Sequence, residues 1–174
     1  MIGFGTIGRA VARAVVEGRA GSADIAAVLV RDVEKARAAE IIKPGVKLTA
    51  DPDQFFAAGM DVVVEAAGHA GLKRYGERAL RGGLDVVAVS VGAFADDEFL
   101  SSMKRAAEES RRRLLVPSGA LGALDAVSAA AVGEIEEVVL VARKPPAAWK
   151  GTPAEEAASK AVSEPVCFYE GRAR

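Results

Sequence analysis

The chain has 174 residues, which is enough for one full domain and part of a second. Hydrophobic residues make up 51% of it and aromatic residues only 5%, so its core must consist of aliphatic side chains, as in sheets that helices cover on both faces. The net charge of −1 comes from interspersed acids and bases, which argues against nucleic acid or an anionic membrane as a partner. A single cysteine, Cys167, excludes an intramolecular disulfide, and no apolar run reaches about 18 residues, so we expect a cytoplasmic protein.

The first residues of the chain read G-x-G-x-x-G, from Gly3 to Gly8. Apolar residues recur at helical spacing from Ile7 onward, which predicts a strand, a tight turn and a helix that opens on the motif. In such a corner Gly3 allows the turn, Gly5 lets a pyrophosphate approach the backbone, and Gly8 lets the helix pack close to its strand. The N–H groups at the helix start, at Thr6 and Ile7, would face the phosphates. The motif therefore predicts a dinucleotide site.

Two other interpretations of this corner remain open. A glycine-rich turn can bind nothing at all, and a methyltransferase can hold S-adenosylmethionine at a similar place. The helix, the next strand and an acidic residue that follow in order favour a dinucleotide site over an empty turn. The third glycine at the helix start favours a pyrophosphate over S-adenosylmethionine.

Strand and helix signals alternate through the first two thirds of the chain, which predicts parallel strands joined by right-handed helical crossovers. The strand candidates are the apolar runs 24–30, 46–49, 61–67, 84–91 and 114–116. The helix candidates are 33–42, a helix that starts at Pro52, 72–80, and one that starts at Asp96 and reaches about residue 110. Only Met1 and Ile2 precede the first glycine, so we expect the front of the first strand to be missing. The predicted fold class is α/β, with a Rossmann-type doubly wound parallel sheet over residues 1–117.

Two opposite charges, Arg31 and Asp32, end the second predicted strand. An acidic side chain about 20 residues past the glycines takes the hydroxyls of the adenosine ribose, and Asp32 lies close to that position. Asp32 is equally suited to cap the next helix. A guanidinium at Arg31 would attract a 2′-phosphate, and at about 4 Å either charge contributes only about 1 kcal/mol in water and about 4 kcal/mol near a protein surface. The sequence therefore leaves the cofactor open between NAD and NADP.

Small residues follow two further strands, at the edge where open α/β sheets bind ligands. We expect Ala67, Gly68 and Gly92 to lie against the cofactor there. His69, the only histidine, has two interpretations: a proton-transfer group, or a solvated residue at a helix start. We favour the second. The sequence predicts no metal site.

Beyond Pro117 the pattern changes. An alanine-rich run over 121–132 predicts a helix, and the loose alternation over 134–142 predicts a strand with one exposed face. A polar stretch over 143–153 reads as a loop, and 165–169 reads as a strand without a partner. We therefore expect residues 118–174 to begin an α+β substrate and dimerisation domain that is incomplete.

Five segments taken together resemble the L-aspartate dehydrogenase family over nearly all of the chain. They read GFGTIG, EAAGHA, SVGAFAD, PSGALGALD and RKPPAAW. The resemblance implies NAD(P)-linked oxidative deamination of L-aspartate to oxaloacetate and ammonia through iminoaspartate, a reaction that can feed NAD biosynthesis. It implies a homodimer built largely on the second domain. It also implies that Ala120 contacts the cofactor and that Ser118 and Gly119 lie on the substrate side.

The chain departs from this family in two ways. The first strand is short, and the family's catalytic histidine and a cofactor-binding asparagine lie in a segment expected beyond Arg174. His69 does not match that histidine, so the resemblance places no catalytic residue within these 174 residues. We therefore expect a chain truncated at both ends that binds nucleotide without turning over aspartate. The alternative function is a non-catalytic NAD(P)-binding fragment or redox-sensing module.

Overall fold

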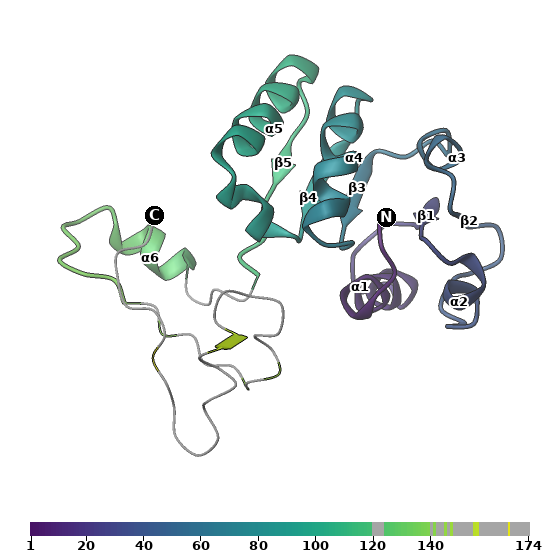
Figure 1. Cartoon of the computed structure of the whole chain (residues 1–174), viewed down its shortest axis with the longest axis horizontal. Coiled ribbons are helices and arrows are strands. Elements are labelled where there is room, and N and C mark those ends of the chain that lie inside the picture. Colours follow the sequence, from purple (N-terminus) through teal and green to yellow (C-terminus); the bar gives the residue numbers. More distant parts are fainter. Residues whose placement is uncertain are drawn as a thin grey trace. The chain divides into compact units, whose positions relative to one another are not determined.

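The computed structural model describes residues 1–119, 124–139, 141, 145, 147, 155, 156 and 167. The chain divides into two compact units, Met1–Gly122 and Ala123–Arg174. The first unit carries the described sheet and most of the described helices (Figure 1).

All strands of the first unit run parallel. They are β1 (Ala27–Leu29), β2 (Lys47–Thr49), β3 (Val62–Glu65), β4 (Asp85–Ala88) and β5 (Leu114–Leu115). β1 pairs with β2, and β4 pairs with both β3 and β5. Ile2 joins the two groups through parallel bridges to Leu29 and Glu65. When Ile2 is counted as the first strand, the spatial order is third, second, first, fourth, fifth, sixth, which is the order of a doubly wound dinucleotide-binding sheet. The predicted fold class is confirmed.

Met1 and Ile2 take the place of the central strand. Ile2 donates to the Val64 carbonyl oxygen at 2.8 Å, and the Met1 carbonyl oxygen accepts from Leu29 at 2.9 Å. The amino group of Met1 donates to the carbonyl oxygen of Ala27 at 2.6 Å, and its burial lowers the pKa of this group to about 5. The bridges of Ile2 therefore place the start of the glycine motif at the centre of the sheet.

Five α-helices and one short 3-10 helix accompany these strands. They are α1 (Thr6–Val16), α2 (Val33–Arg37), α3 (Pro52–Phe56), α4 (His69–Arg81), η1 (Val91–Ala95) and α5 (Asp97–Ser110). Two helices start where the sequence predicted, at Pro52 and next to Asp96. A carboxylate caps each of them: Asp51 accepts from the N–H of Asp53, and Asp96 accepts from that of Phe99. α2 is shorter than predicted. The N–H groups of Ala39 and Glu40 bond to carbonyl oxygens only three residues back, and Glu40 then turns the chain away with a left-handed φ of 53°.

Two apolar clusters cover the two faces of the sheet. One packs helices α3, α4 and α5 against the strands, around Phe55, Leu72 and Met103. The other packs α1 and α2 against them, around Phe4 and Ala12. Helices on both faces are what the aliphatic composition predicted.

In α1 the buried face differs from the predicted apolar stripe. Gly8 and Ala12 are its buried residues, whereas Ile7 is 53% exposed. The helix lies so close to its strand that only the smallest residues fit at the contact, which leaves the larger Ile7 outside.

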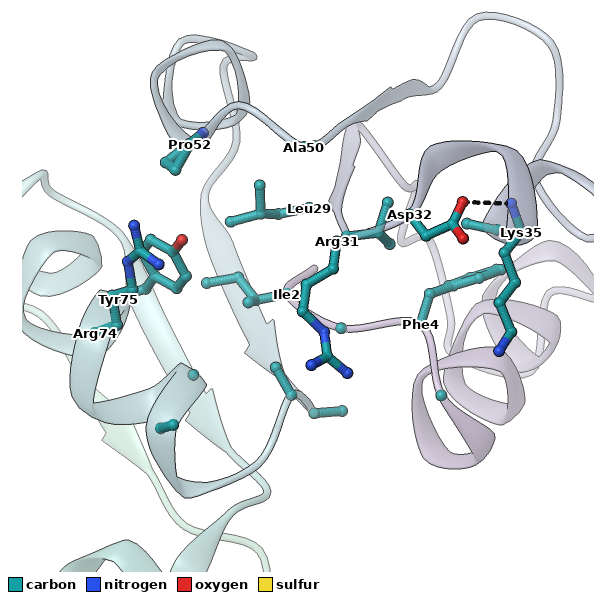
Figure 2. A pocket seen from close by; sticks show the side chains of 18 of the residues that line it. Ile2, Phe4, Leu29, Arg31, Asp32, Lys35, Ala50, Pro52, Arg74 and Tyr75 are labelled. Carbon is teal, nitrogen blue, oxygen red and sulfur yellow. Dashed lines mark hydrogen bonds between the residues drawn. The ribbon is translucent and has the colours of Figure 1, made fainter.

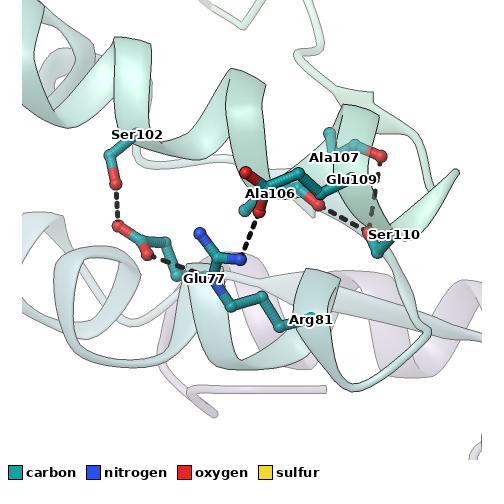
Figure 3. A network of polar contacts seen from close by, with 7 residues as sticks. All are labelled: Glu77, Arg81, Ser102, Ala106, Ala107, Glu109 and Ser110. Carbon is teal, nitrogen blue, oxygen red and sulfur yellow. Dashed lines mark hydrogen bonds and ion pairs between the residues drawn. The ribbon is translucent and has the colours of Figure 1, made fainter.

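Helices α4 and α5 lie side by side on one face (Figure 1). Gly76 is buried at their contact. A larger residue would not fit there, because its β-carbon would lie only 2.8 Å from Cε of Met103. At the surface of the pair, Ser102 donates to Glu77, and Arg81 Nη1 donates to Glu109 Oε2 at 2.5 Å (Figure 3). These contacts fix the helix that begins at the edge of the candidate site.

The second unit contains helix α6 (Leu124–Ala130), which ends two residues before the predicted end at 132, while the predicted start over 121–123 lies outside the described residues. The strand predicted over 134–142 is wrong where the structure describes it, since residues 134–139 form none. Val138 is 57% and Val139 69% exposed, so the alternation does not separate a buried from an exposed face. A strand also needs a hydrogen-bonded neighbour, and the described residues of this unit hold no strand. Most of the predicted loop over 143–153 and of the strand over 165–169 lies outside the described residues.

Candidate dinucleotide site

A pocket of about 1080 Å³ opens at the carboxyl ends of the strands in the first unit. Its walls come from the turn after Ile2, the ends of β1, β2 and β3, and the first two turns of α4. Ile2 lies between β1 on one side and β3 on the other. The strand order reverses direction at this position, so the pocket lies at the topological switch point of the sheet. This is the position where doubly wound sheets bind dinucleotides.

Each of the three glycines has a different surrounding. Gly3 has a φ of +89°, and a β-carbon there would lie 2.5 Å from the carbonyl oxygen of Ala66. A β-carbon at Gly8 would lie 2.4 Å from the carbonyl oxygen of Gly3, which agrees with close packing of helix on strand. At Gly5 nothing lies within 4 Å of that position, so the turn faces open space that a phosphate group can fill. The backbone therefore fits a pyrophosphate at Gly5.

Helix α1 begins beside this space. Gly5 is its N-cap residue, and no side chain caps the helix. The N–H groups of the first turn, including Thr6, are therefore available to an anionic ligand. Arg9 lines the pocket as well, with Nε donating to the Phe4 carbonyl oxygen at 3.1 Å and the guanidinium 5.8 Å from the Phe4 ring centre. Arg9 is not among the site residues predicted from the sequence. The signal was its position in the first helical turn after the glycines.

Arg31 and Asp32, which the sequence predicted to contact the cofactor, line the pocket at the end of β1. Oδ1 of Asp32 accepts from the backbone N–H of Lys35 at 2.9 Å, so this carboxylate caps α2. Figure 2 shows the Arg31 side chain extending into the pocket while the Asp32 carboxylate turns toward the start of α2. Lys35, which the sequence did not single out, also lines the pocket.

The opposite wall comes from α4. Arg74 and Tyr75 line the pocket there, and the Arg74 guanidinium lies 5.2 Å from the Tyr75 ring centre (Figure 2). The sequence gave no motif for either residue, although both follow the predicted Ala67–Gly68 turn by two helical turns. The charged lining residues are four cations, Arg9, Arg31, Lys35 and Arg74, and one carboxylate, Asp32. This excess of positive charge suits a ligand that carries a diphosphate.

The remaining predicted site residues fall into several places. Ala67 lines the pocket, whereas Ile7, Gly8, Gly68 and Gly92 do not. Gly68 is the N-cap residue of α4, with a φ of 89°. Gly92 and His69 lie together, because a β-carbon at Gly92 would be 2.6 Å from Nε2 of His69.

His69 is the first residue of α4 and is exposed. The helix begins three residues before the predicted start at residue 72 because Gly68 supplies the positive φ at its N-cap. Ser118 and Gly119 follow β5, are exposed and do not line the pocket, and Ala120 lies outside the described residues.

Within the described part of the chain, no group of three or more His, Cys, Asp or Glu side chains is placed to hold a metal ion. None of the described helices is both long and apolar enough to cross a membrane.

The fold and the pocket define a Rossmann-type NAD-binding domain. The family model described as "Homoserine dehydrogenase, NAD binding domain" matches residues 3–117. The model described as "Aspartate dehydrogenase, C-terminal" matches residues 125–174 and narrows the assignment. The chain belongs to the L-aspartate dehydrogenase family.

Relatives from bacteria and archaea agree with this assignment. The L-aspartate dehydrogenase of Brucella anthropi is 39% identical over 175 residues, which cover 100% of this chain and 64% of that protein. The L-aspartate dehydrogenase of Methanocaldococcus jannaschii is 34% identical over 177 residues, which cover 98% of this chain and 64% of that protein. The crystal structure of aspartate dehydrogenase from Thermotoga maritima superposes with a TM-score of 0.53 at 26% identity, over 74% of this chain and 48% of that one. The chain thus spans less than two thirds of the length of these relatives.

Proposed function

We propose that this chain forms the NAD(P)-binding part of an enzyme that oxidatively deaminates L-aspartate to oxaloacetate and ammonia through iminoaspartate. The observation that carries the proposal is the open turn at Gly5 beside the uncapped start of α1, in a pocket lined by four cations and one carboxylate. A bound NAD or NADP would supply the hydride acceptor for this reaction. The protein holds the dinucleotide in a fixed orientation and keeps water away from the reacting carbon.

The residues of the pocket divide by the part of the dinucleotide that each would contact. The turn from Gly3 to Gly8, with Thr6, Ile7 and Arg9 at its helix, would hold the pyrophosphate. Arg31 and Asp32 would hold the adenosine ribose, on the β1 side. The nicotinamide half would then lie on the β3 and β4 side, near Ala67, Gly68 and Gly92, with Ser118 and Gly119 toward the substrate. The family resemblance adds a cofactor contact for Ala120.

Residues 1–174 alone should bind nucleotide without oxidising aspartate. The family resemblance assigns proton transfer to a histidine in a later segment, and a general acid or base typically contributes about 10² to 10⁴ in rate. A chain that contains the complete substrate domain should therefore turn over aspartate, and residues 1–174 should not. Equal rates in the two chains would make His69 or another residue of the described part the proton-transfer group. The homodimer, the cytoplasmic location and the link to NAD biosynthesis stay predictions from the sequence.

The nucleotide site is tested by titrating residues 1–174 with NAD, NADP and S-adenosylmethionine. We expect both dinucleotides to bind and S-adenosylmethionine not to bind, because only the dinucleotides place a diphosphate at Gly5. Gly5→Val should abolish dinucleotide binding while far-UV circular dichroism stays unchanged, since the new side chain would occupy open space rather than clash with protein. Unchanged binding in this variant would move the site elsewhere. Dinucleotide binding without turnover in the longer chain as well would favour the non-catalytic, redox-sensing alternative.

A further inference from the structure

Glu65 is a carboxylate buried at the end of β3, with only 1% of its surface exposed. Its Oε1 accepts from the backbone N–H of Ala67 at 2.6 Å and from the hydroxyl of Ser90 at 2.8 Å. Its Oε2 accepts from the backbone N–H of Ser90 at 3.1 Å. One side chain therefore ties the segment that leaves β3 to the segment that leaves β4.

Both tied segments lie at the carboxyl edge of the sheet, and the one that leaves β3 packs on the glycine turn. The backbone of Ala66 and Ala67 packs so closely on Gly3 that a β-carbon at Gly3 would lie 2.8 Å from Cα of Ala67. Ser90 leads directly into η1, where Gly92 packs against His69. The carboxylate of Glu65 thus holds the backbone after β3 and the backbone after β4 together, on the β3 side of Ile2.

A dinucleotide in this pocket has its halves on opposite sides of Ile2. Its pyrophosphate belongs at the turn around Gly5, and Asp32 marks the adenosine side beyond β1. The other half must then extend over the ends of β3 and β4, where Glu65 fixes the backbone. We propose that Glu65 is a positioning residue for the nicotinamide half of the cofactor. This inference rests on the proposed function.

Glu65→Gln tests the proposal with almost no change in volume. Each carboxylate oxygen accepts from a different backbone N–H, one from Ala67 and one from Ser90. Whichever way the new amide is oriented, its NH₂ group faces one of these donors and breaks that contact. Ser90→Ala is a milder second variant, because it removes the hydroxyl bond and keeps both backbone bonds.

Asp85→Asn is the matched control on the neighbouring strand. Asp85 is also buried, at 7% exposed, and accepts from the Arg113 backbone at 2.9 Å and from its guanidinium at 2.6 and 2.8 Å. It begins β4, so it lies at the amino end of the strand, away from the pocket. The exchange of Asp85 for asparagine should lower the free energy of unfolding, because it also removes a buried carboxylate, but it should not change the affinity for the cofactor.

The experiment compares the dissociation constants of NAD and of ADP, which lacks the nicotinamide half, for the unmutated chain and the three variants. We expect Glu65→Gln to weaken NAD by about tenfold or more and ADP by less than about twofold. Ser90→Ala should show the same pattern with a smaller loss, and it decides the question if Glu65→Gln does not fold. Asp85→Asn should leave both constants within about twofold while its denaturation midpoint falls.

An equal loss for NAD and ADP, or no loss for NAD, in the variants at positions 65 and 90 would overturn the proposal. Failure of the proposed function gives a different result, since the unmutated chain would then bind neither ligand.

Discussion

The amino group of Met1 should make the stability of a chain that begins at this residue depend on pH. It is buried at the centre of the sheet, 2.6 Å from the carbonyl oxygen of Ala27. Burial removes hydration from the charged form, which lowers the pKa of the group from 8.0 to about 5. The folded chain therefore favours the neutral amine.

The sign and size of the effect follow from this shift. Between about pH 5 and pH 8 the unfolded chain binds the proton and the folded chain does not, so the free energy of unfolding rises with pH. The shift of about three units, at about 1.4 kcal/mol each, amounts to about 4 kcal/mol over this window. Above pH 8 both states are neutral and the effect is absent, whereas below pH 5 the full loss of stability is present.

Urea unfolding at pH 5, 6.5 and 8, followed by circular dichroism, measures this dependence. The control is the same chain with an acetylated amino terminus, whose N–H can still donate to Ala27 but does not titrate. The two chains should differ by about 4 kcal/mol at pH 5, and the difference should shrink toward zero at pH 8. Parallel pH profiles for the two chains would refute the reasoning, because the charge at Met1 would then be accommodated in the fold.

Two further predictions concern the glycine turn and the choice of cofactor. Gly8→Ala should lower the free energy of unfolding by about 1 to 3 kcal/mol in urea denaturation, because its β-carbon would lie 2.4 Å from the carbonyl oxygen of Gly3. Gly5→Ala, with nothing within 4 Å, should change stability by less than about 0.5 kcal/mol, and similar losses in the two variants would contradict the packing argument. In titrations of the unmutated chain, NAD and NADP should bind within about tenfold of each other, because Arg31 and Asp32 have opposite preferences. Arg31→Ala should weaken NADP by about tenfold or more and NAD by less than about threefold, and an equal effect on both would show that Arg31 does not contact the 2′-phosphate.

The sequence predicted the parts of the fold that depend on local chemistry. The glycine turn requires a positive φ at Gly3 and close packing at Gly8, and only glycine satisfies both. The starts of α3 and α5 depend on a carboxylate that accepts from the first helical turn, which Asp51 and Asp96 supply. Features of this kind are determined by a few neighbouring residues, so the local sequence is sufficient to find them.

Burial was harder to predict than element order. The predicted buried stripe of α1, which began at Ile7, was chosen by hydrophobicity alone. The short distance between α1 and the sheet instead admits only small residues, so Gly8 and Ala12 are the buried ones. The predicted strand over 134–142 failed for a related reason. Its alternating pattern is necessary for a strand with one buried face, but the hydrogen-bonded neighbour comes from elsewhere in the chain and leaves no trace in the local sequence.

The charge of the pocket depends on three segments that the sequence does not connect. Arg9 follows the glycine turn, Lys35 belongs to the first turn of α2, and Arg74 lies in α4. Taken singly, each of these residues has the sequence pattern of a solvent-exposed helix residue. They come to line one pocket because parallel crossovers return the helix starts to the same edge of the sheet. The same geometry brings Glu65 to that edge beside Ser90, 25 residues away in sequence. A buried glutamate that follows three valines on a strand is the one sequence signal that could have identified it, since a carboxylate at such a position must find donors in the fold.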